Sequence, residues 1–475
     1  MPENSHHGSV PKDLALFLSR IKRDFGGLLA PKREISIARA PARLDIMGGV
    51  GDYSGSLVLE GTLQEATIVA VQKRTDRRVL LKSLGVETEG MQNLVELYLD
   101  DFFHNGQLKS VAELQSQLKQ NPRSRWIAYV VGFFPLLIQE GVAADFSVGA
   151  NIAIKSDIPL GSGVASSAAL EVATLLALQH AFSLQIKPED LPLLCQKVEN
   201  HLVGAPCGVM DQLTSALGHK DKLLAIRCQP AEIIDSIPCP KGYQFAGIDS
   251  GVKHSVSGSH YADARTATFM GRKMCLQSAQ KEAIAGDIPY GGYLANINPQ
   301  TWQETLKKKI PGRMRGIDFI NRYGSHDDPA TQIDPDKIYS LRRCTEHPIL
   351  ENARVGEFIR LLQTQSLGEE QIIQAGELMV ESHLSYSQNC RLGSKETDLL
   401  VDLVLHQGPK NGLYGAKISG GGSGGTVAVL LANGQENLLK NIVSLYIDTT
   451  KLPATLFFQS SPGALQLGVI KTQFE

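Results

Sequence analysis

A glycine- and serine-rich loop that runs straight into a long apolar helix constrains this chain more than any other feature. Residues 158–173 read IPLGSGVASSAALEVA, and helical, mostly apolar sequence continues to residue 184. A helix that is apolar on all sides has to be buried, so we expect a substantial core around residues 164–184. The 475 residues suffice for two domains. Helical and strand-like runs alternate in two blocks, which predicts an α+β, two-lobed enzyme.

The same loop predicts an anion-binding site. The start of a helix carries unpaired backbone N–H groups and partial positive charge, and a preceding glycine loop makes it suited to phosphate. A serine hydroxyl at this place can also bind Mg²⁺, which prefers oxygen ligands. The loop matches neither the GxxxxGK[ST] nor the GxGxxG pattern. An N-capped helix after a flexible loop is the alternative.

Two further stretches are rich in glycine. Residues 40–55 read APARLDIMGGVGDYSG, where bare backbone lies among charged residues and favours close approach to a polar ligand. Residues 415–430 read GAKISGGGSGGTVAVL, with five glycines in six positions. Such a run cannot form stable regular structure and fits close contact with a ligand or another loop. The alternatives are a turn with solvated charges and a flexible hairpin.

Composition excludes several classes of partner. With 47 basic and 49 acidic residues, the chain gives no sign of binding nucleic acid or an anionic membrane. The first residues contain no apolar core for a signal peptide, and apolar runs fall short of the ~20 residues of a membrane helix. Seven scattered cysteines without a CxxC pair argue against a disulfide framework or a zinc site. We expect a cytoplasmic protein that acts on small molecules.

The order of the three glycine-rich stretches resembles the GHMP kinases, within them the galactokinases and the kinase region of plant L-arabinokinases. The resemblance extends from about residue 36 to the end and includes GAPCGVMDQLTSALG, FAGIDSGVKHSVSGSHY, GELMVESHLSYS and SSPGA. It implies the two-lobed GHMP kinase fold with the active site in the cleft between the lobes. The N-terminal lobe would span 32–235 and hold the sugar and the ATP phosphate loop. The C-terminal lobe would span 236–475, with an insertion at about 286–345.

The resemblance also implies a role for individual residues. Asp211 of GVMDQ would be the general base at the anomeric hydroxyl, and Arg43 would pair with it. The residues implied to contact the sugar are Asp52, Gly208, Tyr261 and Gly49. Those implied to bind the ATP phosphates are Gly161, Ser162, Gly163, Ser166, Ser167 and Ala168. Mg²⁺ would be held by Ser167 and Glu199. Structural alternatives are a helix-capping Asp211, a salt-bridged Arg43, a solvated Glu199 and a core Tyr261.

One loop departs from the galactokinase pattern. Galactokinases have Gly-Glu-His-x-Asp-Tyr where residues 48–53 read GGVGDY. The missing glutamate and histidine are the pair expected near the C6 hydroxymethyl group of galactose, and L-arabinose has the same ring stereochemistry without C6. The resemblance therefore implies an ATP-dependent sugar 1-kinase that forms L-arabinose 1-phosphate. Gly49 is expected to leave space, so that galactose could enter with water filling the gap.

Three alternatives stay open. The first is a galactokinase. The second is a uronic-acid 1-kinase, which needs a cation near C6 that residues 49–51 do not supply. The third is a non-catalytic sugar sensor, a class that loses part of the phosphate loop or a catalytic residue, although this chain retains both. The insertion also resembles the plant enzymes, whose glycosyltransferase-like N-terminal region is missing here, so we expect a stand-alone kinase.

Overall fold

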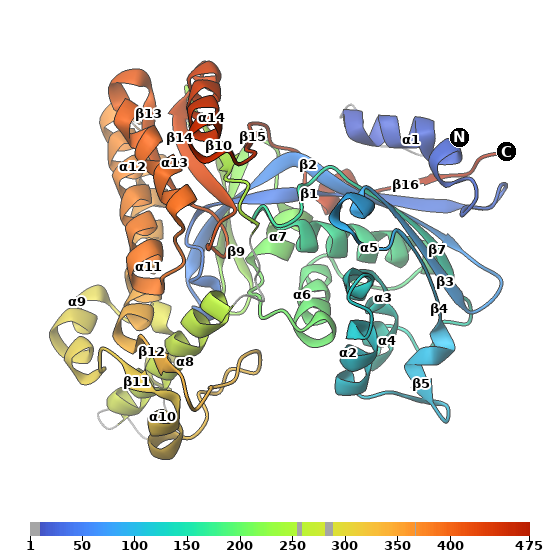
Figure 1. Cartoon of the computed structure of the whole chain (residues 1–475), viewed down its shortest axis with the longest axis horizontal. Helices are drawn as coiled ribbons and strands as arrows, with labels where there is room; N and C mark the ends of the chain where they lie inside the picture. The colour runs from blue at the N-terminus through green and yellow to red at the C-terminus, as the bar shows by residue number, and fades with distance from the viewer. Residues whose placement is uncertain (1–9, 254–258, 281–287, 366) are drawn as a thin grey trace.

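The computed structural model describes residues 10–253, 259–280, 288–365 and 367–475. Two sheets organise this part of the chain, each covered by helices (Figure 1). Among these residues no helix combines the length and the apolar character needed to cross a membrane. The mixed two-block architecture expected from the sequence is confirmed.

The first sheet has eight strands in the order β16-β1-β2-β7-β3-β4, and β8 and β9 branch from β2. Every residue of β1 is buried, because helices cover one face of the sheet at this strand and the N-terminal helix together with elements of the second half of the chain covers the other. Its strands are β1 (Ile35–Met47), β2 (Leu57–Lys73), β3 (Arg78–Leu84), β4 (Leu94–Tyr98), β7 (Ala150–Ser156), β8 (Lys222–Arg227), β9 (Glu232–Pro238) and β16 (Val469–Thr472).

Helix α5 (Ser166–Phe182) is the apolar helix expected over 164–184, and it packs against β1 and β2. It has no polar face, so it is enclosed between the sheet and a layer of shorter helices (Figure 1). Those helices are α2 (Val111–Lys119), α3 (Ala128–Val131), α4 (Phe133–Gln139), α6 (Asp190–Lys197) and α7 (Met210–Leu217). On the other face, α1 (Lys12–Phe25) packs its apolar stripe against β1 and β2.

The second sheet has four strands in the order β13-β14-β10-β15. They are β10 (Tyr243–Asp249), β13 (Leu413–Ile418), β14 (Thr426–Ala432) and β15 (Thr455–Phe457). The five long helices of this half of the chain are α8 (Ser259–Gln280), α11 (Leu341–Leu362), α12 (Glu369–Leu384), α13 (Lys395–Gln407) and α14 (Glu436–Thr450). Helices α11 and α8 pack together, and α12 lies along β13.

The insertion expected at about 286–345 lies against α8 (Figure 1). Residues 286 and 287 fall outside the described part. From 288 the segment is made of short elements, as expected, but its last residues already belong to α11. Its apolar side chains, among them Trp302 and Phe319, share one core with Tyr261 and Met270 of α8. Its regular elements include α9 (Pro299–Thr301), α10 (Gly316–Tyr323), β11 (Met314–Arg315) and β12 (Ile338–Tyr339).

The end of the chain departs from the expected lobe boundaries. Strand β16 pairs antiparallel with β1, Ile35 opposite Thr472, so the tail belongs to the first sheet and not to the second lobe of 236–475. An unpaired edge of β1 would expose a row of backbone donors and acceptors, and β16 covers it. The expected boundary at 235/236 also falls inside β9, which pairs with β8.

Candidate active site

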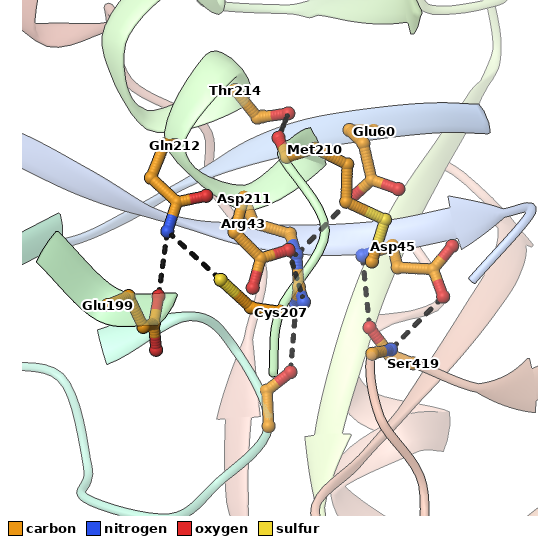
Figure 2. Close-up of polar contacts among 12 residues, drawn as sticks. Arg43, Asp45, Glu60, Glu199, Cys207, Met210, Asp211, Gln212, Thr214 and Ser419 are labelled. Carbon is orange, nitrogen blue, oxygen red and sulfur yellow. Dashed lines mark hydrogen bonds and ion pairs between the residues drawn. The ribbon is translucent and has the colours of Figure 1, made fainter. Parts of the chain in front are cut away.

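Arg43 of β1 and Asp211 of α7 face each other (Figure 2). The Arg43 Nε donates to Asp211 Oδ1 at 2.9 Å, and Nη2 lies 2.8 Å from the same oxygen. Arg43 follows a register shift in β1, and such bulges commonly re-aim a side chain next to an active site. Asp211 lies in the first turn of α7 and keeps 22% of its side chain exposed. In the described part of the chain no hydrogen bond engages its second oxygen, Oδ2, which is left to meet a ligand.

A buried glutamate behind Arg43 was not anticipated. Glu60 of β2 lies 3.3 Å from Arg43 Nε and is fully buried, and neither carboxylate oxygen has a hydrogen-bond partner among the described residues. Burial raises the pKa of Glu60 well above its ordinary value, and Asp45, directly opposite on β1, raises it further. One signal in the sequence could have revealed it: a lone acid in the mostly apolar and otherwise uncharged run SLVLEGTL.

The expected phosphate loop leads into α5 as the sequence predicts. Gly161 and Gly163 both have φ of 75°, a conformation that favours glycine. No side chain caps the helix start at Ala165, so its backbone N–H groups are open to an anion. The Ser162 hydroxyl donates to the Pro159 carbonyl, which leaves that residue's backbone, not its side chain, for a phosphate. The residues expected at the first turn of the helix are in place: Ser166, Ser167 and Ala168.

The phosphate loop is tied to the catalytic pair and to the third glycine-rich stretch. Arg43 Nη1 donates to the Gly163 carbonyl at 2.8 Å. Thr426, which follows the glycines of the third stretch, donates from its hydroxyl to the Ser162 carbonyl at 2.7 Å. A Cβ built on Gly425 would lie 3.0 Å from that same carbonyl oxygen. The third glycine-rich stretch therefore lies against another loop, one of the two roles expected for it.

The residues expected to hold Mg²⁺ lie together. Glu199 is buried and hydrogen-bonds with Ser167, and burial together with Asp211 raises its pKa to about 7. Gln212 donates to Glu199 at 2.7 Å (Figure 2). It also donates to Glu171 at 3.0 Å. Within the described residues no group of three metal-binding side chains occurs, whereas Mg²⁺ is usually held by one or two protein oxygens and the phosphates of its nucleotide. The Ser167–Glu199 oxygens fit that ion.

Three of the four residues expected to contact the sugar lie together as one wall: Asp52, Gly208 and Tyr261. Asp52 is buried, and its Oδ1 has no hydrogen-bond partner among the described residues. A Cβ on Gly208 would lie 1.6 Å from Asp52 Oδ2, so only glycine fits opposite this carboxylate. Tyr261 is buried in the same region, its ring 6.1 Å from that of Tyr53 in an edge-to-face contact.

Gly49 does not leave the open space that the sequence suggested. A Cβ at this residue would lie 1.8 Å from the Tyr386 hydroxyl and 2.2 Å from Asp45 Oδ2. The Gly49 carbonyl is hydrogen-bonded to His347 Nε2 at 3.1 Å. The expectation of a water-filled gap is therefore wrong, because a buried tyrosine from a distant part of the chain fills it. Val50, next to Gly49, is buried with φ of 59°, a strained conformation for a β-branched residue.

The acidity of Asp52 predicts a pH dependence. Burial, with a smaller contribution from the charge of Asp211, raises the pKa of Asp52 to about 6, while Arg265 and Arg43 oppose the shift. A carboxylate that accepts sugar hydroxyls has to be ionised, so at saturating Mg²⁺ we expect kcat/KM for the sugar to fall by about tenfold per pH unit below 6. Asp52→Asn should lower kcat/KM and remove this acid limb. A pH profile from 5 to 8 measures it, and an unchanged limb in the variant would refute the assignment.

Comparison with known proteins decides the family. A model described as the GHMP kinases N terminal domain matches residues 128–219, and the galactokinase galactose-binding signature matches residues 25–73. A galactokinase of Chloroflexus aggregans is 30% identical over 420 residues, which cover 88% of each chain. The chain belongs to the galactokinase family of GHMP kinases.

Two further comparisons bear on this GHMP kinase. The L-arabinokinase of Arabidopsis thaliana is 39% identical over 503 residues, covering 95% of this chain, and this chain spans 48% of that protein. The structure of Lactococcus lactis galactokinase complexed with galactose matches 96% of this chain and all of that one, with a TM-score of 0.73 at 21% identity. The expected GHMP kinase fold is thereby confirmed.

Proposed function

We propose that this kinase transfers the γ-phosphoryl group of ATP to the anomeric hydroxyl of L-arabinose, giving L-arabinose 1-phosphate. The placement of Asp211 and Arg43 beside the phosphate loop supports the reaction type. Phosphoryl transfer depends mainly on positioning and on stabilising charge, and these residues supply both.

Each residue has a distinct part in this mechanism. The Asp211 Oδ2 oxygen would take the proton of the anomeric hydroxyl as the oxygen attacks phosphorus. Arg43 holds Oδ1, so the carboxylate is fixed in orientation, and its permanent charge stabilises the attacking oxygen. The backbone at the start of α5 would bind the ATP phosphates. Mg²⁺ held by Ser167 and Glu199 would offset negative charge on those phosphates.

The observation that carries the choice of sugar is the contact behind Gly49. Tyr386 and Asp45 exclude any side chain at this residue, so residues 49–51 offer no side-chain hydrogen bond to a hydroxymethyl group. A hydroxyl buried without a partner costs about 1–3 kcal/mol, which favours a sugar that lacks C6. The 39% identity to an L-arabinokinase supports the same substrate.

D-Galactose is the second candidate, because galactokinases are among the relatives. A sugar acid is less well supported. Three cations lie close to the site in the described part of the chain, and each is paired: Arg43 with Asp211, Lys417 with Asp45, and Arg265 with Asp328.

The test is kcat/KM for L-arabinose, D-galactose and D-glucuronate, measured side by side with Mg²⁺-ATP and a coupled ADP readout. We expect L-arabinose to be preferred over D-galactose by about tenfold or more, the ratio that an unpaired hydroxyl produces. A preference for D-galactose would overturn the choice of sugar. Sugar binding without ADP production would contradict a kinase and indicate a non-catalytic sugar sensor.

A further inference from the structure

One ion pair joins the insertion to α8, the helix that carries Tyr261. Arg265 of α8 donates from Nε to Asp328 Oδ2 at 2.9 Å and from Nη2 to Oδ1 at 2.8 Å. Both side chains are buried, with 7% and 0% of their surface exposed. This two-bond geometry fixes the plane of the guanidinium as well as its position.

Asp328 is held by a turn of the insertion itself. Its carboxylate also accepts from the Ala330 N–H at 3.2 Å and from the Thr331 hydroxyl at 2.6 Å, and its own N–H donates to His326 Nδ1. Burial alone would raise the pKa of Asp328, but the hydrogen bond and charge of Arg265 bring it below the ordinary value. The carboxylate is therefore a fixed negative charge.

Arg265 in turn supports the sugar wall. Its Nη1 lies 3.3 Å from the Cys207 carbonyl, one residue before the Gly208 that fits against Asp52. Its guanidinium carbon lies 5.1 Å from the ring centre of Tyr53, the residue after Asp52. The charge of Arg265 also acts on Asp52 and on Tyr261, lowering the pKa of both groups against the effect of burial.

We propose that Asp328 is a positioning and specificity-determining residue of the sugar site, acting through Arg265. Its carboxylate fixes the guanidinium behind the wall of Asp52, Gly208 and Tyr261. It also neutralises that cation, so the pocket holds no free positive charge for a sugar acid. This inference rests on the proposed function as a sugar kinase, and it gives the insertion a part in choosing the sugar.

The consequence can be measured as a change in substrate preference. In Asp328→Asn the guanidinium keeps a neutral hydrogen-bond partner but loses its counter-charge. We expect KM for the neutral sugar to rise severalfold with little change in kcat. D-Galacturonate has the galactose ring with a carboxylate at C6, and its kcat/KM relative to the neutral sugar should rise by about tenfold or more, the gain typical of a charged hydrogen bond.

Two variants serve as controls. Asp327→Asn changes the preceding residue, whose side chain pairs with Lys273 and is itself 56% exposed. This variant should leave both the KM for the neutral sugar and the substrate preference unchanged. Asp328→Glu keeps the negative charge but shifts its position. KM for the neutral sugar should therefore rise, while the preference between D-galacturonate and the neutral sugar should stay that of the parent enzyme. If Asp328→Asn does not fold, the Asp328→Glu measurement alone decides: an unchanged KM would overturn the proposal.

The proposal would also be overturned if Asp328→Asn had the same preference between D-galacturonate and the neutral sugar as the parent enzyme. Measurements on the parent enzyme distinguish this result from a failure of the proposed function. Whichever of L-arabinose and D-galactose the parent phosphorylates better serves as the neutral sugar with which D-galacturonate is compared. If the parent phosphorylates neither sugar, the same ratio is taken from Kd values by calorimetry, and an unchanged ratio refutes the role of Asp328.

Discussion

Asp211→Asn is expected to lower kcat by about 10²–10⁴-fold, the range that a positioned general base contributes. The amide matches the carboxylate in shape and still accepts a hydrogen bond from Arg43, but it cannot take a proton from the anomeric hydroxyl. ATP binding should be nearly unchanged, because the phosphate loop does not depend on this side chain. Steady-state kinetics with a direct titration of ATP binding would measure both effects.

The matched control is Asp190→Asn, which alters an exposed aspartate at the start of the neighbouring helix α6. It should leave kcat within about twofold, as surface substitutions commonly have small effects. If Asp211→Asn were as active as this control, the proton would have to leave by another route, and the role of Asp211 would be wrong.

Arg43→Ala should reduce both turnover and stability. Beside its partner Asp211, Arg43 also contacts Glu60, a fully buried acid 3.3 Å from the guanidinium. Removing one partner of a buried ion pair costs about 3–5 kcal/mol in the free energy of unfolding. Burial already raises the pKa of Glu60, so this acid can take up a proton once Arg43 is removed. We therefore expect a loss in urea denaturation that stays below this size and grows as the pH rises, together with a fall in kcat of at least about 10²-fold from lost charge stabilisation.

A double variant separates the two effects. In Arg43→Ala with Glu60→Gln, residue 60 can no longer ionise, so the part of the stability loss that grows with pH should disappear while kcat stays low. Interaction energies between neighbouring residues are measured in this way. If that part of the loss persisted, Glu60 would not be its cause. If activity returned in the double variant, Arg43 would serve only to compensate Glu60.

The sequence predicted those parts of the site that depend on local chain geometry. Loop 158–165 and α5 follow from glycines before a long apolar run, because helix ends and positive φ angles are local properties. Arg43 and Asp211 were paired through resemblance, and the structure brings them together.

The parts that the sequence did not predict depend on contacts between distant segments. The space beside Gly49 is filled by Tyr386, more than 300 residues away along the chain, and no spacing rule connects them. Likewise, Arg265 could not be matched with Asp328, since the segment that holds the aspartate was expected to be irregular. A lone acid such as Glu60 can be noticed in an apolar strand, but its partner cannot be named without the fold.

The buried pair of Asp45 and Lys417 limits how this kinase can open. Asp45 lies on β1 of the first sheet and Lys417 on β13 of the second, their atoms are 2.9 Å apart, and neither side chain is exposed. Separating the two sheets at this point would leave one unpaired buried charge on each side. The free-energy cost would be a large fraction of the free energy of unfolding of a whole domain. Any motion that admits a sugar or releases a product must therefore pivot about this contact, and the outer segments, not the junction of β1 and β13, have to move.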